Sequence, residues 1–409
     1  MSRFVSSMRP LLMAAAPSAA RAARPVFARH LAAAAAAAAK PAELSAAKLE
    51  ITKTTKPKTP LPHNELVFGR SFSDHMIVVE WDQQTGWSTP KITPYGKLQL
   101  DPSCTVFHYG VECFEGMKAY KDKAGKIRLF RPDMNMARLN RSALRLAMPS
   151  FDQKELTEII KKFVKLEEKW IPQEKGYSLY LRPTMIATQP SLGVGPSSRA
   201  MLFVIASPVG PYFKSGFTAV SLLAQSSYLR AWPGGTGDAK VGGNYAPTIM
   251  PQVEANKKGY QQILWLFGPN DELTEVGTMN CFVYWVNEQG EKELVTPPLD
   301  GTILPGVTRD SILGLTRKWG EFKVSERKLT MAEIVKASNE KRLLEMFGAG
   351  TACIVSPIKA IHYQDKDLVV PLDPANPTAQ AGPLTKRINE TILGIQYGEI
   401  PSEWSVVAE

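Results

Sequence analysis

The sequence predicts an α+β protein with two domains. Its 409 residues exceed what one simple core organises, so the chain should divide. Short apolar runs typical of strands occur in both halves, together with longer stretches of helical periodicity. A stretch rich in proline and glycine, residues 208–216, interrupts this pattern near the middle. We therefore expect a small N-terminal α/β domain over residues 66–209, a linker over residues 210–217 and a larger α+β domain over residues 218–409.

The N-terminal segment has the composition of a mitochondrial presequence. Residues 1–42 are rich in alanine and arginine, and the first acidic residue of the chain is Glu43. The alanine run 32–39 is too short and too weakly apolar to cross a bilayer, which takes about 20 apolar residues. We expect residues 1–42 to be a transit peptide for the mitochondrial matrix; the alternative is a tail without a targeting role. Residues 43–65, rich in Lys, Thr and Pro, should form a flexible lead-in.

The net charge does not predict a nucleic-acid partner. The formal charge is +10, but six of the basic residues precede Glu43, which leaves about +4 for the rest of the chain, where acids and bases are interspersed. A nucleic-acid-binding face would show a basic cluster or stripe. We expect neither a nucleic-acid nor a membrane partner. A bound metal is not expected either, because no histidine has metal-ligand spacing and the cysteines are scattered: Cys104, Cys113, Cys281 and Cys353.

The first half contains three strand candidates and one clear helix. Strands are predicted around residues 77–79, 177–182 and 201–205. A helix is predicted over residues 151–170, because apolar residues recur there at the spacing of one buried helical face. These are Leu156, Ile159, Ile160, Phe163 and Val164.

The second half alternates strands and helices. Residues 263–267 and 281–285 have the pattern of strands. A helix should follow Pro305, with an apolar face marked by Ile312, Leu315 and Trp319. Another should begin at Thr330, where Thr330 and Glu333 have the spacing of a capping box.

Lys240 is a lone amine between two glycine pairs, Gly234-Gly235 and Gly242-Gly243. Flanking glycines let a backbone approach a ligand closely, whereas most lysines are simply exposed in loops. A nucleotide phosphate loop is the other functional interpretation. It fails on spacing, and Val241 stands where Mg²⁺ coordination needs a hydroxyl.

Glu275 lies between two apolar strand-like runs, so we expect it to be buried rather than to be a surface or capping glutamate. Burial without a positive partner would cost several kcal/mol. A pyridinium N–H would supply that partner, and Lys240 would supply a Schiff base. Together, these residues are what an enzyme needs to hold pyridoxal 5'-phosphate. Phosphate donors are available at the helix start Val307-Thr308 and in the loop that contains Thr351.

Five motifs follow one another between Phe68 and the C-terminus: residues 114–118, 130–136, 191–194, 275–280 and 304–307. In order and in sequence they resemble the class IV pyridoxal-phosphate aminotransferases, and among these the eukaryotic branched-chain amino acid aminotransferases. The resemblance implies the two-domain fold-type IV architecture, which is D-amino acid aminotransferase-like. It also implies a homodimer.

For the cofactor, the resemblance makes Lys240 the Schiff-base lysine and proton shuttle. Glu275 would contact the pyridine nitrogen, and Tyr245 would hydrogen-bond the ring oxygen. The phosphate group would be bound by Arg138, the amides of Val307 and Thr308, and the hydroxyl of Thr351.

For the substrate, the resemblance implies that Thr278 and the nearby amide of Ala352 bind the α-carboxylate. Arg182 would meet the side-chain carboxylate of glutamate, so that one site takes both substrate types. An apolar pocket, partly supplied by the partner subunit, would consist of Phe68, Tyr109, Phe114, Tyr180 and Val194. Without the resemblance, such aromatics would be interpreted as core.

The implied reaction is a reversible ping-pong transfer of an amino group between leucine, isoleucine or valine and 2-oxoglutarate. A D-amino acid aminotransferase or an aminodeoxychorismate lyase is the alternative within the class, disfavoured by the chain length and by the matches at Tyr180, Arg182 and Val194. A non-enzymatic homologue is disfavoured because Lys240 and Glu275 are both present.

The chain departs from the animal mitochondrial members at one motif. Those members have a C-x-x-C pair where this chain reads Cys353-Ile354-Val355-Ser356. An intramolecular thiol–disulfide switch therefore cannot form there.

The targeting prediction can be tested with a fluorescent fusion. We expect residues 1–45 to carry the reporter into mitochondria and to be cleaved before about Glu43, because the segment is basic and free of acids up to that residue. Imaging and N-terminal sequencing of the imported reporter give the result. A reporter that stays in the cytosol would refute the prediction.

Overall fold

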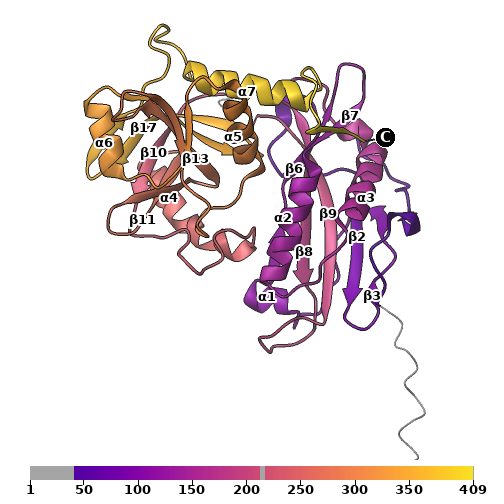
Figure 1. The fold of residues 1–409 in the computed structure, drawn as a ribbon. Coiled ribbons are helices and arrows are strands. Elements are labelled where there is room, and N and C mark those ends of the chain that lie inside the picture. Colours follow the sequence, from indigo (N-terminus) through magenta and orange to yellow (C-terminus); the bar gives the residue numbers. More distant parts are fainter. Residues whose placement is uncertain (1–40, 212–216, 409) are drawn as a thin grey trace, which may run out of the picture. The chain divides into compact units, whose positions relative to one another are not determined.

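Two β-sheets organise residues 41–211 and 217–408, the part of the chain that the computed structural model describes (Figure 1). This mixed α and β architecture confirms the predicted fold class. Residues 1–40, most of the predicted transit peptide, lie outside the described residues, as do residues 212–216 of the predicted linker. Within the described ranges, no helix is both long and apolar enough to cross a membrane.

The first sheet has the order β1-β4-β2-β9-β8-β6-β7-β19, with β3 beside β2 and β5 beside β8. All of these pairings are antiparallel except β1 with β4. The predicted strands in this half are confirmed as β2, β8 and β9, each longer than predicted. The strands are β1 (Glu50–Ile51), β2 (His75–Asp82), β3 (Gly86–Trp87), β4 (Lys91–Pro94), β5 (Glu112–Phe114), β6 (Met117–Lys121), β7 (Ile127–Phe130), β8 (Ser178–Ala187), β9 (Arg199–Val209) and β19 (Ser405–Val407).

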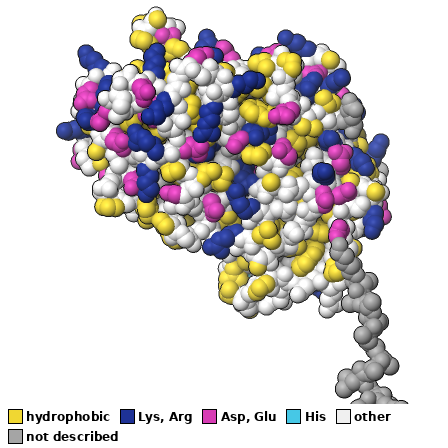
Figure 2. Space-filling view, in the orientation of Figure 1, with side chains coloured by type: hydrophobic (Ala, Val, Ile, Leu, Met, Phe, Trp, Pro, Cys, Tyr) yellow, Lys and Arg dark blue, Asp and Glu magenta, His cyan; other side chains and the backbone are white. Residues whose placement is uncertain are grey.

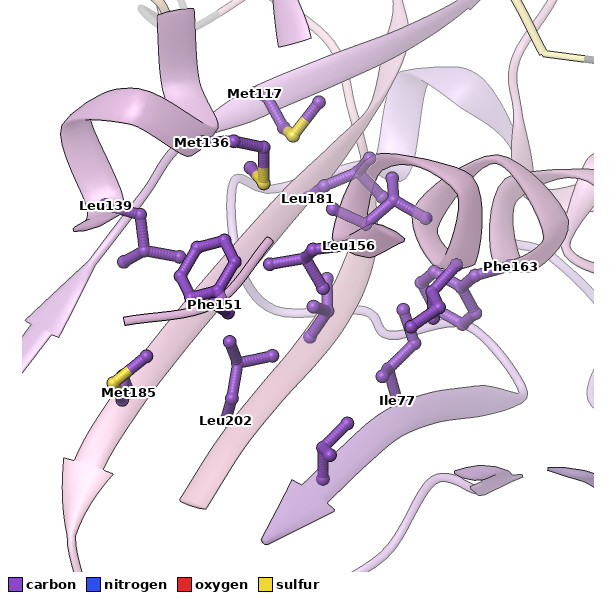
Figure 3. Close-up of a cluster of buried hydrophobic side chains, with 14 of the residues drawn as sticks. Ile77, Met117, Met136, Leu139, Phe151, Leu156, Phe163, Leu181, Met185 and Leu202 are labelled. Carbon is purple, nitrogen blue, oxygen red and sulfur yellow. The ribbon is translucent and has the colours of Figure 1, made fainter. Parts of the chain in front are cut away.

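Helices α2 (Pro132–Arg145) and α3 (Gln153–Leu166) pack on this sheet, and a short helix, α1 (Thr105–Tyr109), precedes β5. The apolar face predicted for α3 is buried in the core that α2, α3 and the strands share (Figure 3). The helix begins after Asp152, whose carboxylate accepts the N–H groups of Lys154 and Glu155. It ends earlier than predicted, and residues 168–170 form a separate 3-10 turn.

The second sheet has the order β12-β11-β10-β17-β16-β13-β14-β15, with β18 beside β17. The predicted strands are confirmed as β11 and β13. Strand β12 was not predicted, so Glu275 lies in a strand rather than in a loop between strands. The strands are β10 (Val220–Gln225), β11 (Gln262–Phe267), β12 (Glu272–Val276), β13 (Met279–Val286), β14 (Lys292–Thr296), β15 (Lys323–Glu326), β16 (Leu343–Gly350), β17 (Ile354–Tyr363) and β18 (Lys366–Val369).

Both helices predicted for the second half are present. They are α5 (Val307–Trp319) and α6 (Met331–Asn339), and the described residues after Val220 also form α4 (Ile249–Lys257) and α7 (Pro383–Gln396). The capping box of α6 forms in both directions. The Thr330 hydroxyl accepts the Glu333 N–H at 3.2 Å, and the Glu333 carboxylate accepts the Thr330 N–H at 2.8 Å.

Two segments join the first sheet although the sequence prediction assigned one to a flexible lead-in and the other to the second domain. In the predicted lead-in, Leu44 and Ala46 are only 3% and 7% exposed, and β1 pairs with β4. At the C-terminus, β19 pairs with β7, so the last residues return to the sheet of the first half. Both strands have three residues or fewer, too few to show the alternation by which a strand is recognised.

Candidate active site

A cavity of about 360 Å³ is lined by residues from elements of both sheets. Such a concave site with a few converging polar groups is the usual form of a ligand pocket. Twelve of the fifteen predicted site residues line it, and the three exceptions are Tyr109, Val194 and Glu275. The twelve are Phe68, Phe114, Arg138, Tyr180, Arg182, Lys240, Tyr245, Thr278, Val307, Thr308, Thr351 and Ala352.

Lys240 is held in this cavity from both its backbone and its side chain. Its N–H donates to Ser142 Oγ of α2 at 2.8 Å, and its carbonyl accepts the N–H of Phe114 of β5 at 3.0 Å. The Nζ atom donates to Tyr245 Oη at 2.8 Å and lies 4.7 Å from the centre of the Phe114 ring. No carboxylate of a described residue lies within 4 Å of Nζ. The amine is therefore positioned without an ion-pair partner.

The glycines around Lys240 let the loop pack against protein. A Cβ on Gly242 would lie 1.7 Å from Oε1 of Glu112, and one on Gly237 would lie 2.6 Å from the Cβ of Ala231. At Gly237 the backbone carbonyls of Gly301 and Thr302 lie 2.8 Å from that Cβ, so a side chain there would displace the loop, whereas at Gly242 the Glu112 side chain would have to move. The sequence interpretation, in which glycine allows close approach to a ligand, is therefore incomplete.

Glu275 lies behind the wall of the cavity, 2% exposed. Its Oε2 accepts Nε–H of Arg230 at 2.7 Å. Its Oε1 accepts the N–H of Leu304 at 2.8 Å and Nδ2–H of Asn280 at 3.3 Å, and both of these residues line the cavity. Burial raises the pKa of Glu275, and the adjacent Arg230 opposes this rise. Arg230, which the sequence analysis did not consider, therefore already supplies one positive partner to this carboxylate.

Arg138 and Glu115 form a second buried ion pair. Glu115 is fully buried, and its carboxylate accepts from Arg138 Nε at 2.6 Å and from Nη2 at 2.8 Å. Arg138 Nη1 also donates to the carbonyl of Pro305 at 2.9 Å. Burial acts to lower the pKa of Arg138, but Glu115, together with Tyr245 and Tyr180, raises it above its ordinary value. Since a guanidinium has five N–H donors, about two remain for a ligand in the cavity.

The start of α5 adds further donors beside Arg138. Its N-cap residue, Gly306, has no side chain to cap the helix, and Val307 and Thr308 of the first turn line the cavity. Unsatisfied N–H groups and the helix dipole make such a terminus attractive to anions. The loop residue Thr351 lines the same cavity. A guanidinium, a helix start and a threonine therefore line the same cavity, and groups of these kinds bind anions.

An aromatic group lines another part of the cavity. The Phe68 and Tyr180 rings meet edge to face at 4.9 Å, and the Phe114 and Tyr245 rings lie 5.0 Å apart. Arg182 lies among them, with Cζ 4.7 Å from the Phe114 ring and Nη2 donating to Tyr180 Oη at 3.0 Å. Its Nε is buried without a hydrogen-bond partner. The region is therefore largely aromatic, and the Arg182 guanidinium within it keeps unused donor capacity.

Tyr109 and Val194 are not brought to the cavity within this chain. They are 44% and 83% exposed. Tyr109 donates through its hydroxyl to the carbonyl of Leu192, which joins the end of α1 to the loop that contains Val194. The two residues therefore share one exposed surface.

Sequence reasoning missed three residues that support the site: Glu115, Arg230 and Asn280. Glu115 had a usable signal, since it sits in an apolar stretch as Glu275 does. Arg230 and Asn280 become relevant only through the fold, which brings both to the Glu275 carboxylate.

Comparison with known proteins gives a consistent picture. Residues 112–361 match the family model described as amino-transferase class IV. The chain is 59% identical to the branched-chain-amino-acid aminotransferase of Dictyostelium discoideum, over 87% of this chain and 94% of that protein. It is 53% identical to the mitochondrial enzyme of that name from Schizosaccharomyces pombe, over 92% and 88% of the two chains. It is also 53% identical to the cytosolic enzyme from Saccharomyces cerevisiae, over 90% and 98%.

Solved structures show a similar fold. One is the branched-chain aminotransferase from the thermophilic archaeon Thermoproteus uzoniensis with norvaline. It matches with a TM-score of 0.64 and 25% identity, over 81% of this chain and 99% of that one.

The buried ion pair of Arg230 and Glu275 allows a prediction about the stability of the fold. We expect Arg230→Met to lower the free energy of unfolding by about 3–5 kcal/mol, because Glu275 would be left buried without its cation. Urea unfolding measures this loss. Arg317→Met is a matched control, since Arg317 also pairs at 2.7 Å but is 50% exposed, and it should cost no more than about 1 kcal/mol. Equal small losses in both variants would contradict the prediction.

Proposed function

The chain belongs to the branched-chain-amino-acid aminotransferases of the amino-transferase class IV family, and we propose that it transfers an amino group reversibly between leucine, isoleucine or valine and 2-oxoglutarate. The observation that carries the proposal is the amine of Lys240. It lines the cavity, donates to the phenol of Tyr245 and has no carboxylate partner among the described residues.

The residues around the cavity fit pyridoxal 5'-phosphate. Lys240 would meet its aldehyde and Tyr245 its ring oxygen. Glu275 would contact its ring nitrogen, since the donors Arg230, Leu304 and Asn280 leave about one of four acceptor sites on that carboxylate. When bound, this cofactor supplies an aldehyde that condenses with amines and a ring that accepts electrons from the substrate Cα. The phosphate would be held by Arg138, Val307, Thr308 and Thr351.

We propose that Lys240 moves the proton of the reaction. Its Nζ would remove the proton from Cα of the amino acid. The hydrogen bond to Tyr245 keeps this amine at one place in the cavity, and the backbone bonds to Ser142 and Phe114 fix the loop that carries it. Holding a base at a set position removes much of the entropic barrier to proton transfer.

The proposed substrate contacts divide by charge. Thr278 and the amide of Ala352 would bind the α-carboxylate, while Phe68, Phe114 and Tyr180 would receive the branched side chain. Arg182 lies among these rings and has a buried Nε without a partner, which supports a second role in binding the side-chain carboxylate of glutamate. One pocket could then accept both substrate types in turn.

We further propose a homodimer in which a second copy completes the pocket with its Tyr109 and Val194. Several large apolar side chains that are exposed in one chain support this proposal, because exposed apolar patches mark interaction sites. Figure 2 shows hydrophobic side chains gathered at the lower end of the visible face, where Figure 1 places α1. The exposed residues of α1 and the 190–195 loop are Phe107, Tyr109, Leu192 and Val194.

We propose the mitochondrial matrix as the location of the enzyme. Its presequence-like composition supports this, and so does the similarity to a relative named mitochondrial. Another relative of equal identity is named cytosolic, so the fusion experiment above decides between the two compartments.

The central test replaces the proposed base. We expect Lys240→Ala to abolish turnover and the visible absorbance of the purified protein, because both need the ε-amine. Leucine should bleach that absorbance in the wild-type enzyme. Lys257→Ala, at the exposed end of α4, is the control and should leave both unchanged. A Lys240→Ala protein that keeps both properties would overturn the proposal, and activity with D-alanine but not L-leucine would favour the D-amino acid alternative.

The dimer proposal predicts that Val194→Asp weakens association and lowers activity with leucine together, because the charge would be placed in the interface and at the pocket. Val369→Asp is the matched control, since Val369 is also highly exposed, at 71%, but lies on β18. Sedimentation velocity and a leucine assay measure the two effects. A Val194→Asp protein that is monomeric yet fully active would disprove the shared pocket.

A further inference from the structure

A second cavity, of about 140 Å³, shares Ala352 and Cys353 with the wall of the first. The roles proposed for the active site do not use its other polar groups. They include Lys118 of β6, Ser178 of β8 and Ser356 of β17, and the side chains of Tyr120, Thr218, Asn389 and Tyr397 line the cavity as well.

The strand register places two of these groups on the same face. Lys118 of β6 stands opposite Tyr180 of β8, and Ser178 lies two residues before Tyr180. Because alternate residues of a strand point to the same side, Lys118 and Ser178 share one face of the first sheet. Ser356 comes from the second sheet, where it pairs with Gly348. Both sheets therefore contribute a polar side chain to this small cavity.

Each of the three groups has unused hydrogen-bonding capacity. The hydroxyls of Ser178 and Ser356 are buried, each side chain being 1% exposed, and neither has a hydrogen-bond partner. Lys118 is 6% exposed, and its Nζ donates once, to the carbonyl of Ala352 at 2.7 Å. An ammonium has three N–H donors, so two are left over.

The cavity also lacks a negative charge to balance Lys118. Within the described part of the chain, no carboxylate lies within 4 Å of its Nζ, and Lys118 is the only charged side chain in the cavity lining. Burial raises the pKa of the Cys353 thiol to about 11 and that of Tyr397 to about 12, so both are neutral at pH 7. Burial also lowers the pKa of Lys118 to about 8, which still leaves it mostly charged at pH 7.

Water alone does not meet this need. Waters in a polar cavity of this size could satisfy the two hydroxyls. They would not supply a counter-charge, and a buried charge without one is costly. The single cation, Lys118, balances one negative charge. The small volume of the cavity excludes a bulky ligand.

We propose that this cavity binds one small monovalent anion, of the size of chloride or formate, through the ammonium of Lys118 and the hydroxyls of Ser178 and Ser356. The bound anion holds Lys118 in place, and Lys118 in turn holds the carbonyl of Ala352. The site therefore lies directly behind the loop residues that line the active-site cavity.

Thermal unfolding of the cofactor-loaded enzyme tests the proposal without measuring activity. The probe is potassium chloride, compared at equal ionic strength with potassium gluconate, whose anion is too large for the cavity. We expect the unfolding midpoint of the wild-type protein to be higher in chloride by about 2–4 °C. Lys118→Met should abolish the difference. Lys162→Met should retain it, because Lys162 also donates to a backbone carbonyl, that of Ala46, but does not line the cavity.

Two outcomes of this experiment would overturn the proposal: no chloride effect in the wild-type protein, or an equal effect in Lys118→Met. If Lys118→Met does not fold, the double variant Ser178→Ala/Ser356→Ala decides in its place, and it should lose most of the chloride effect. A direct check is a crystal grown in bromide. An anomalous peak beside Lys118 Nζ is expected, and water alone at that position would refute the site.

Discussion

The geometry of the active-site cavity depends on the hydrogen bonds and the ion pair that the buried guanidinium of Arg138 makes. Arg138 comes from α2, holds Glu115 between β5 and β6 with two hydrogen bonds, and reaches the carbonyl of Pro305 just before α5. One side chain therefore fixes the helix start of the second half against the sheet of the first. Since Glu115 is fully buried, neither partner can be lost without leaving a charge in the interior.

The charges around the two cavities follow one pattern. Arg138 and Arg230 each have a buried carboxylate, and these pairs belong to the scaffold. Lys118, Arg182 and Lys240 have no carboxylate within 4 Å among residues 41–211 and 217–408. These three side chains lie in or beside the cavities, and each keeps N–H groups that no carboxylate accepts. We propose that the side-chain carboxylate of glutamate pairs with Arg182, a small anion with Lys118 and the aldehyde of the cofactor with Lys240.

Local patterns in the sequence were sufficient for many elements. The periodicity of α3, the capping box of α6 and the apolar runs of β11 and β13 all lie within a few residues of each other, so each could be predicted. Strands β1 and β19 could not, because they have only two and three residues, and β12 could not, because its sequence Glu272–Val276 contains two glutamates and is not an apolar run.

The candidate site was predictable to a different extent for each residue. Lys240 and Glu275 could be proposed from their immediate neighbours in the sequence, and the family resemblance supplied most of the others. The partner of Glu275 could not be predicted, because Arg230 lies 45 positions away and reaches it only through the folded loops. The resemblance also named Tyr109 and Val194, but it could not show that one chain leaves both on its surface.

That exposure links association to catalysis in the proposed homodimer. Burying a large apolar side chain is worth about 1.5–3 kcal/mol, so a surface that exposes Phe107, Leu192 and Val194 gains stability when a second chain covers it. Tyr109 ties α1 to the 190–195 loop, and the two would therefore dock as one unit. If this unit closes the partner's pocket, the apolar surface that drives association is the same surface that recognises the branched side chain. A monomer would then keep Lys240 and its supporting contacts but would lack one wall of the substrate pocket.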